Sequence, residues 1–336
     1  SLSTQRGAVM CRLRTVAVIV YATLTSLASM ASATAATLPT KPVCVAPAKP
    51  GGGFDLTCRV AAAWFESQLK HPMQVRFMPG GIGAAAFKMF ATDVTDDPNT
   101  LVAFSSGSLL NIAVGKFGAV SPDDVRFVAS AGADYGVVAV SAQSSLRTFD
   151  DLMLRLRDPK MRVTIGGGGS IGSQDWVKAA LLFKAAGRNP KGMRYVAFDG
   201  GGEALNNLAN DNVSVYTGDV SELRSHMASN KFRILAVLAD QRLPGLFRDV
   251  PTAREMGVDV TWASFRGYYM GRHVAPAAYD FYVDAFRRAH ESPEFAKIRN
   301  DKGLFEFSLT GESFHRHVKT QVMQLKQLVD DADLRQ

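Results

Sequence analysis

Short apolar segments alternate with longer segments of helical periodicity along most of this chain. Apolar runs of strand length lie near residues 43–46, 74–78, 100–104, 136–140, 162–165, 193–198, 213–217 and 233–238. Between most of them, apolar residues recur every three or four positions, as in amphipathic helices. The clearest helix covers 172–186, and Gly187 is expected to end it. This alternation predicts an α/β fold of parallel strands covered by helices, with ligand sites at the carboxyl ends of the strands.

The first 36 residues have a different character. Arg12 and Arg14 precede an uncharged run from Val16 to Met30, and the small residues ASATAA follow. This is the pattern of a secretory signal peptide, so residues 1–36 are left out of the expected fold, and the mature chain is expected to begin near Thr34 or Thr37. Removing the three arginines of this segment lowers the net charge from +7 to +4. No basic run of the nucleic-acid-binding kind remains, so nucleic acid is not an expected partner.

Two of the three cysteines, Cys44 and Cys58, lie in the part that remains. Cys44 belongs to the first predicted strand and Cys58 to the first turns of the next helix, and the two elements pack together in a βα unit. In an oxidising compartment this pair is expected to form a disulfide. Two buried free thiols are the alternative.

Five loops rich in glycine or serine each follow a predicted strand and open a predicted helix. They are PAKPGGGFDLTCR (47–59), FMPGGIGAAAF (77–87), VAFSSGSLLN (102–111), TIGGGGSIGSQDW (164–176) and VAFDGGGEAL (196–205). Glycines at such turns leave the peptide N–H groups accessible, and the positive end of a helix favours an anion. Several such loops around one cleft are expected to bind more than one carboxylate, and the serine hydroxyls can add hydrogen bonds. Tight βα turns without a ligand are the alternative explanation.

The sequence disfavours both a dinucleotide site and a metal site. Gly81, Gly83 and Ala86 fit the dinucleotide fingerprint, but they lie in the second βα unit and no strand ends in an acidic residue about 20 positions later. His315 and His317 are two residues apart on a predicted helix, so their side chains diverge and make a poor metal pair. Neither a cofactor nor a metal is therefore expected.

One enzyme hypothesis remains open. Residues 168–172 fit the G-x-S-x-G nucleophile motif of serine hydrolases, with Ser170 as the nucleophile. Asp219 or Asp249 and then His273 follow in the order that such enzymes use. The motif arises easily by chance in a chain with 29 glycines, so a non-enzymatic function is the main interpretation.

These motifs resemble the periplasmic solute-binding proteins of tripartite tricarboxylate transporters, also called Bug proteins. The resemblance covers about residues 42–333 and is greatest to the tricarboxylate (citrate-type) branch. It is carried by the stretches CVAPAKPGGGFDLTCR, MPGGIGA, SSGSLLN, GSIGSQDW, RYVAFDGGGEAL, TGDVSE, RLPGLFRDVPTAREMG and KGLFEF.

The resemblance implies a type II periplasmic-binding-protein fold with two Rossmann-like lobes and a ligand cleft between them. Lobe one would comprise residues 41–141 plus 265–336, and lobe two residues 142–264. Such a protein would be a periplasmic monomer that binds a citrate-like tricarboxylate or a dicarboxylate. It would deliver the ligand to the membrane subunits of an ion-gradient-driven transporter, or report it to a membrane sensor kinase.

The glycine loops and the resemblance together indicate which residues bind the carboxylates. The expected ligand contacts are Gly51, Gly52, Gly53, Phe54 and Asp55 in the first loop, Ser105, Ser106 and Gly107 in the third, Gly169, Ser170 and Ser173 in the fourth, and Gly200, Gly201 and Gly202 in the fifth. Lys49 is expected to neutralise a further carboxylate, and Asp219 to accept a hydrogen bond from a ligand hydroxyl.

Overall fold

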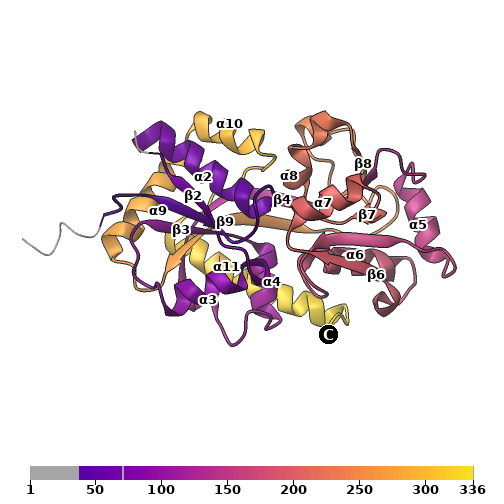
Figure 1. The fold of residues 1–336 in the computed structure, drawn as a ribbon, viewed down its shortest axis with the longest axis horizontal. Coiled ribbons are helices and arrows are strands. Elements are labelled where there is room, and N and C mark those ends of the chain that lie inside the picture. Colours follow the sequence, from indigo (N-terminus) through magenta and orange to yellow (C-terminus); the bar gives the residue numbers. More distant parts are fainter. Residues whose placement is uncertain (1–37, 70–71, 336) are drawn as a thin grey trace, which may run out of the picture. The chain divides into compact units, whose positions relative to one another are not determined.

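The computed structural model describes residues 38–69 and 72–335 of the 336-residue chain (Figure 1). The expected signal peptide and its cleavage site lie outside the described residues. The strands are β1 (Val43–Ala46), β2 (Gln74–Phe77), β3 (Thr100–Ser105), β4 (Val125–Ser141), β5 (Thr164–Gly168), β6 (Arg194–Phe198), β7 (Val215–Tyr216), β8 (Phe232–Leu238) and β9 (Ala263–Gly271). The helices are α2 (Gly53–Leu69), α3 (Ala84–Thr92), α4 (Ser106–Ala113), α5 (Phe149–Arg157), α6 (Gln174–Ala185), α7 (Gly201–Ala209), α8 (Val220–Arg224), α9 (Pro276–His290), α10 (Pro293–Asp301) and α11 (Gly311–Asp331).

The predicted alternation of strands and helices is confirmed, and so is the end of the clearest helix. Helix α6 ends at Ala185, and Gly187 follows with a φ of +78°, a left-handed conformation that glycine adopts without strain.

The strands form one curled sheet in the order β2-β1-β3-β9-β4-β7-β5-β6, and β8 pairs with β4 (Figure 1). We call β2, β1, β3, β9 and residues 125–135 of β4 the first half, and residues 136–141 of β4 with β8, β7, β5 and β6 the second half. Each half has a parallel core, β2-β1-β3 in the first and β6-β5-β7 in the second. The expectation of purely parallel sheets was wrong, because β4 and β9 run antiparallel to their neighbours.

Strands β4 and β9 connect the two halves. Residues Val125–Tyr135 of β4 pair with β9, and from Gly136 onward β4 pairs with β8. The apolar pattern predicts a strand only at residues 136–140 in this region and none at β9. Both strands are almost wholly buried, and β9 carries Arg266 and three aromatic residues within its nine positions, so it lacks the simple apolar run that marks the other strands.

The predicted disulfide joins Cys44 in β1 to Cys58 in α2, with their Cα atoms 5.5 Å apart. Both cysteines are completely buried, in a core that includes Trp64, Phe65 and Phe286. The disulfide closes the segment that contains the first glycine loop, and so fixes the start of α2 relative to the end of β1.

Aromatic side chains dominate the core of the first half, where the sheet meets α11. Phe104 and Phe127 lie with ring centroids 4.8 Å apart, and Phe265 packs edge-on against Phe314 of α11 at 5.8 Å. Each such pair contributes about 0.5–1.5 kcal/mol beyond the burial of apolar area. This core holds β9, and with it Arg266, in a fixed position.

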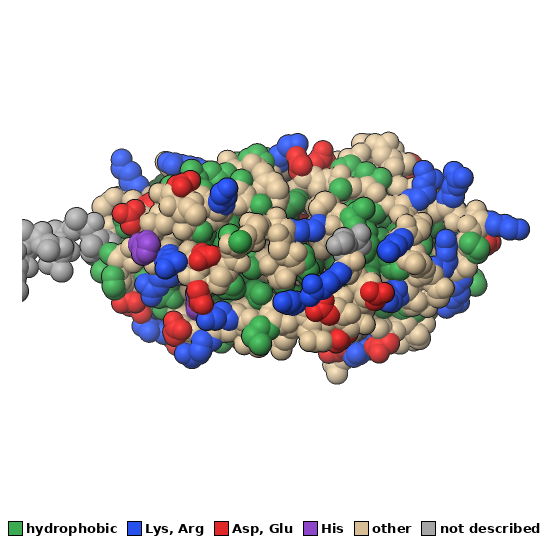
Figure 2. Space-filling model, turned by 90° about the horizontal axis from the view of Figure 1, so that it is seen from below, with side chains coloured by type: hydrophobic (Ala, Val, Ile, Leu, Met, Phe, Trp, Pro, Cys, Tyr) green, Lys and Arg blue, Asp and Glu red, His purple; other side chains and the backbone are tan. Residues whose placement is uncertain are grey.

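The face shown in Figure 2 carries cationic and anionic side chains interspersed with scattered hydrophobic atoms. Within residues 38–69 and 72–335, no helix is long and apolar enough to span a membrane.

Replacing both cysteines by alanine is expected to lower the free energy of unfolding by about 3 kcal/mol, because the closed segment has a sequence separation of 14 residues and its loss frees the unfolded chain. Denaturant unfolding of the oxidised wild type and of the double variant measures the difference. Equal stabilities would show that the disulfide does not constrain the unfolded chain.

Candidate functional site

A cleft of about 330 Å³ lies where the glycine loops of both halves meet. The loops after β1, β3, β5 and β6 line it, together with Arg266 of β9 and Glu222 of α8. Of the residues expected to contact a ligand, the lining includes Lys49, Gly51, Gly52, Gly53, Phe54, Ser105, Gly107, Ser173, Gly200, Gly201 and Gly202. The second glycine loop contributes only Ile82.

The other expected contact residues do not belong to the lining, and each has a partner within the protein. The carboxylate of Asp55 accepts a hydrogen bond from the Gly51 amide at 2.8 Å, and the Ser106 hydroxyl accepts one from the Phe265 amide at 3.0 Å. The Gly169 amide donates to the Phe198 carbonyl at 2.8 Å. Ser170 and Asp219 are described below.

The N-terminal ends of α2 and α7 approach each other across the cleft. A Cβ atom on Gly202 would lie 2.8 Å from the carbonyl oxygen of Gly51, so only glycine permits this approach. For the amides of Gly52, Gly201 and Gly202, no acceptor is found among the hydrogen bonds of residues 38–69 and 72–335, as is usual for the first turn of a helix. These N–H groups are available to an anion in the cleft.

Above these helix ends, Lys49 forms an exposed salt bridge of 2.9 Å with Asp199. Lys49 precedes α2 and Asp199 precedes α7, so the bridge joins the two halves. The Asp199 amide donates to the Glu203 carboxylate at 3.1 Å. Because both partners are more than half exposed, solvent screening limits the contribution of this bridge to stability.

The starts of α4 and α6 form the opposite wall of the cleft. Ser105 caps α4, and its hydroxyl accepts a hydrogen bond from the Gly107 amide at 3.2 Å. The Ser173 hydroxyl, at the start of α6, donates to the Asn111 side chain at 3.3 Å. The side chains of Ser105, Ser173 and Asn111 therefore add polar groups to the cleft lining beside the glycine amides.

Ser170 lies outside the cleft lining. Its hydroxyl accepts a hydrogen bond from Lys116 Nζ at 2.7 Å, and the same Nζ contacts the carbonyl of Ile171. In the described part of the chain, no hydrogen bond joins Ser170 to a histidine, and Asp219 is held by other partners. The geometry thus lacks the serine–histidine contact that the hydrolase alternative needs.

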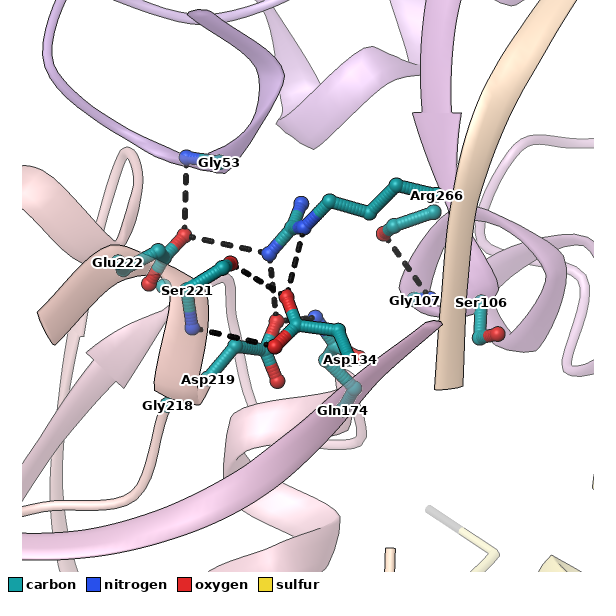
Figure 3. Close-up of polar contacts among 12 residues, drawn as sticks. Gly53, Ser106, Gly107, Asp134, Gln174, Gly218, Asp219, Ser221, Glu222 and Arg266 are labelled. Atoms are coloured by element: carbon teal, nitrogen blue, oxygen red, sulfur yellow. Dashed lines mark hydrogen bonds and ion pairs between the residues drawn. The ribbon is translucent and has the colours of Figure 1, made fainter. Parts of the chain in front are cut away.

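The floor of the cleft is a buried network of charges (Figure 3). Arg266 Nε donates to Asp134 at 2.8 Å, and Arg266 Nη2 donates to Asp219 at 2.8 Å. Lys178 Nζ binds the other oxygen of Asp219 at 2.8 Å and lies 3.0 Å from Asp175. Burial alone would lower the pKa of Arg266 and of Lys178, but the surrounding carboxylates outweigh it and raise both pKa values. Both cations are therefore charged and already neutralised by the protein.

The same network places Asp219 below the cleft surface. Burial would raise the pKa of Asp219, but Lys178 and Arg266 outweigh this effect and lower it, so Asp219 is ionised. Its two oxygens are bonded to Lys178, Arg266 and Gln174, with 3.2 Å to the Gln174 amide nitrogen. The expected role of Asp219 toward a ligand hydroxyl finds no support in this arrangement.

Unlike Asp219, Glu222 lines the cleft. It accepts a hydrogen bond from the Gly53 amide at the start of α2 at 3.0 Å, and one from the Tyr216 hydroxyl. Arg266 Nη2 lies 3.7 Å away (Figure 3). The Glu222 carboxylate also packs directly on Gly201. The Gly53 amide, which the sequence assigned to a ligand, thus binds an internal carboxylate in this structure.

Sequence reasoning missed Glu222 and Arg266 as parts of the site. Asp219 and Glu222 lie in the segment TGDVSE, which directly follows β7. Two acidic residues so close to the end of a strand were the available signal for Glu222. Arg266 gave no such signal, because only the long-range pairing of β9 with β3 and β4 brings it to the cleft.

The ionisation of Glu222 is expected to make stability depend on pH. Burial raises the pKa of Glu222 from 4.5 to about 7, with Arg266 opposing and Asp219 and Asp175 adding to the rise. The folded protein therefore holds this proton more tightly than the unfolded chain. The protonated Glu222 side chain therefore adds to the free energy of unfolding. This contribution is fully present below pH 4.5 and is lost as the pH rises through about 7.

Glu222→Gln removes this titration while keeping the shape of the side chain. Between pH 5 and pH 8, the free energy of unfolding of the wild type should fall relative to that of the variant by on the order of 1–3 kcal/mol. Urea unfolding of both proteins across this range measures the difference. His226, whose pKa burial lowers, titrates in both proteins and cancels. Parallel pH profiles would contradict the assigned pKa.

Comparison with known proteins adds a family match. The family described as "Tripartite tricarboxylate transporter family receptor" matches residues 57–334. A Cupriavidus necator protein, "UPF0065 protein in gbd 5'region", is 21% identical over 285 residues, which cover 84% of this chain and 85% of that protein.

Solved structures share the fold at low identity. MatC from Rhodopseudomonas palustris with bound malate superposes with a TM-score of 0.72 at 20% identity, covering 86% of this chain and 98% of that chain. An R. palustris protein with adipate has a TM-score of 0.79 at 20% identity, covering 88% and 99%. A structure described as a periplasmic transporter has the same TM-score, identity and coverage as the adipate complex. The fold is thus that of periplasmic binding proteins of type II, as the family resemblance implied.

Proposed function

The chain belongs to the tripartite tricarboxylate transporter receptor family, and we propose that it captures a small dicarboxylate or tricarboxylate in the cleft described above. It would deliver this solute in the periplasm to the membrane subunits of an ion-gradient-driven transporter. The observation that carries the proposal is the meeting of glycine-rich helix ends from both halves around one cavity of about 330 Å³.

Main-chain amides are the groups best placed to hold the solute's carboxylates. The amides of Gly52, Gly201 and Gly202 open the helices α2 and α7, whose positive ends favour anions by about 0.3–1 kcal/mol each when exposed and up to about 2 kcal/mol when partly buried. The cationic side chains of the lining are engaged elsewhere, Lys49 with Asp199 and Arg266 with Asp134 and Asp219. Malate and adipate in the two R. palustris structures fit the same chemical class.

We propose that the molecule closes on the solute as two lobes, residues 41–141 plus 265–336 and residues 142–264. These lobes correspond to the two halves of the sheet except for residues 136–141 of β4 and 263–264 of β9. Three observations support this division. The chain passes between the halves along β4 and β9, Lys49 meets Asp199 across the cleft, and the Gly53 amide meets Glu222. A solute bound by amides of both halves would stabilise the closed form because it contacts both only there.

A thermal-shift screen of the mature protein tests the proposed ligand class. Malate, adipate and citrate are candidates, and a solute at 100 times its Kd should add about 2.7 kcal/mol to the stability. Hexanoate is the matched control for adipate, since it has the same chain length and one carboxylate fewer. The absence of a shift with every polycarboxylate tested would contradict the proposal.

Gly52→Val tests the amides at the start of α2. Gly52 does not have a left-handed φ, and a Cβ there would lie 3.6 Å from the Gly202 amide nitrogen, so the fold tolerates the side chain while its methyl groups cover the α7 amides. We expect affinity for the solute found in the screen to fall at least about 100-fold, which is about 2.7 kcal/mol.

Gly192→Val is the matched control, because no atom lies within 4 Å of a Cβ at Gly192 and the residue is outside the cleft lining. Isothermal titration calorimetry measures both variants. Unchanged affinity in Gly52→Val, with the fold intact by circular dichroism, would remove the first loop from the site.

A further inference from the structure

The charges around the floor of the cleft are unequal. Four carboxylates, those of Asp134, Asp175, Asp219 and Glu222, surround only two cations, Lys178 and Arg266, and all six side chains are at most 9% exposed. Arg266 binds Asp134 and Asp219 directly, and Lys178 binds Asp219 and Asp175. Burial raises the pKa of Asp134 and of Asp175, and the neighbouring Asp219 carboxylate adds to the rise.

Glu222 and Asp175 are the carboxylates of this network that line the cleft. Asp175 accepts a hydrogen bond from the Gly168 amide at 2.7 Å and forms a salt bridge with Lys178. Glu222 has two hydrogen-bond donors, the Gly53 amide and the Tyr216 hydroxyl, and a carboxylate offers about four acceptor positions. Glu222 thus retains capacity to accept a further hydrogen bond from the cleft.

The side chain of Gln174, which also lines the cleft, contributes a second hydrogen-bond acceptor. Its amide nitrogen donates to Asp219 at 3.2 Å, which fixes the orientation of the side-chain amide, because the Asp219 carboxylate only accepts. The buried carbonyl oxygen of Gln174 has no hydrogen-bond partner among the described residues. The floor of the cleft therefore offers hydrogen-bond acceptors, whereas the amides of Gly52, Gly201 and Gly202 offer donors at the helix ends.

We propose that Glu222 determines specificity in this site, and that it selects solutes which carry a hydrogen-bond donor, a hydroxyl or an ammonium group, beside their carboxylates. This inference rests on the proposed carboxylate-binding function. A solute carboxylate placed at the Gly53 amide would have to displace Glu222. One placed beside Glu222 would meet like charge once Glu222 is ionised, above its pKa of about 7. A hydroxyl or ammonium group in that position donates to Glu222, while the solute's carboxylates bind the helix ends.

The two kinds of donor can be separated with solutes that differ at one position. Succinate, malate and aspartate are four-carbon dicarboxylates that carry hydrogen, hydroxyl or ammonium at the second carbon. Citrate and tricarballylate form a second pair, with and without a hydroxyl. Calorimetric titration of the wild type should give an affinity at least about tenfold higher for the donor-bearing member of each set that binds, because a buried acceptor left without a donor is unfavourable.

Higher affinity for malate and citrate would identify the hydroxyl as the selected group, and higher affinity for aspartate would identify the ammonium. Equal affinity for all members of a set would overturn the inference while leaving the proposed function intact. Binding of adipate but of none of these acids would overturn the inference alone. Binding of no polycarboxylate at all would overturn the proposed function and the inference with it.

Glu222→Gln assigns the preference to this side chain. The neutral amide can still accept from Gly53 through its oxygen and can donate to Tyr216, so the fold is retained, but it is a weaker acceptor and removes the like charge. We expect the preference for the donor-bearing solute to fall to less than about threefold, mainly through tighter binding of succinate or tricarballylate.

Glu291→Gln is the matched control, since Glu291 is an exposed residue at the end of α9 and does not line the cleft. It should keep the wild-type preference. A preference that survives unchanged in a folded Glu222→Gln protein would show that another group selects the solute.

Discussion

Arg266 is buried in the middle of the molecule, and its charge constrains everything around it. A buried guanidinium requires anionic partners. It finds them in Asp134 on β4 and in Asp219, the residue directly before α8 in the second half. Lys178 imposes the same requirement on Asp175 and Asp219. Both cations are therefore paired with carboxylates of the protein itself. An anionic solute in the cleft has to be held mainly by main-chain amides.

The glycine loops supply these main-chain amides because the loops at the starts of α2 and α7 lie close together. The α2 and α7 turns come so near each other that a side chain at Gly202 would collide with the Gly51 carbonyl, and one at Gly53 would occupy the position of the Arg266 guanidinium. Glycine at position 202 therefore lets the two halves meet and leaves its own N–H group without an internal acceptor, while glycine at position 53 leaves room for Arg266. The disulfide in the first βα unit keeps one of the two turns in place.

Local signals in the sequence were enough to predict much of this arrangement. The βα alternation, the Gly187 helix end and the Cys44–Cys58 pair depend on neighbours within about 15 residues, and the structure has all three. The full length of β4, the existence of β9 and the contact between Arg266 and Asp134 depend on pairings across more than 100 residues, which no local pattern encodes. Glu222 belongs to this second kind, since its partner Gly53 is 169 positions away.

A crystal structure of the mature protein with a bound dicarboxylate tests the central claim most directly. The account predicts carboxylate oxygens at about 3 Å from the amides of Gly52, Gly201 and Gly202, with Arg266 still bonded to Asp134 and Asp219. Carboxylates bound instead by an Arg266 or Lys49 side chain released from its acidic partners, with the glycine amides facing only water, would contradict it.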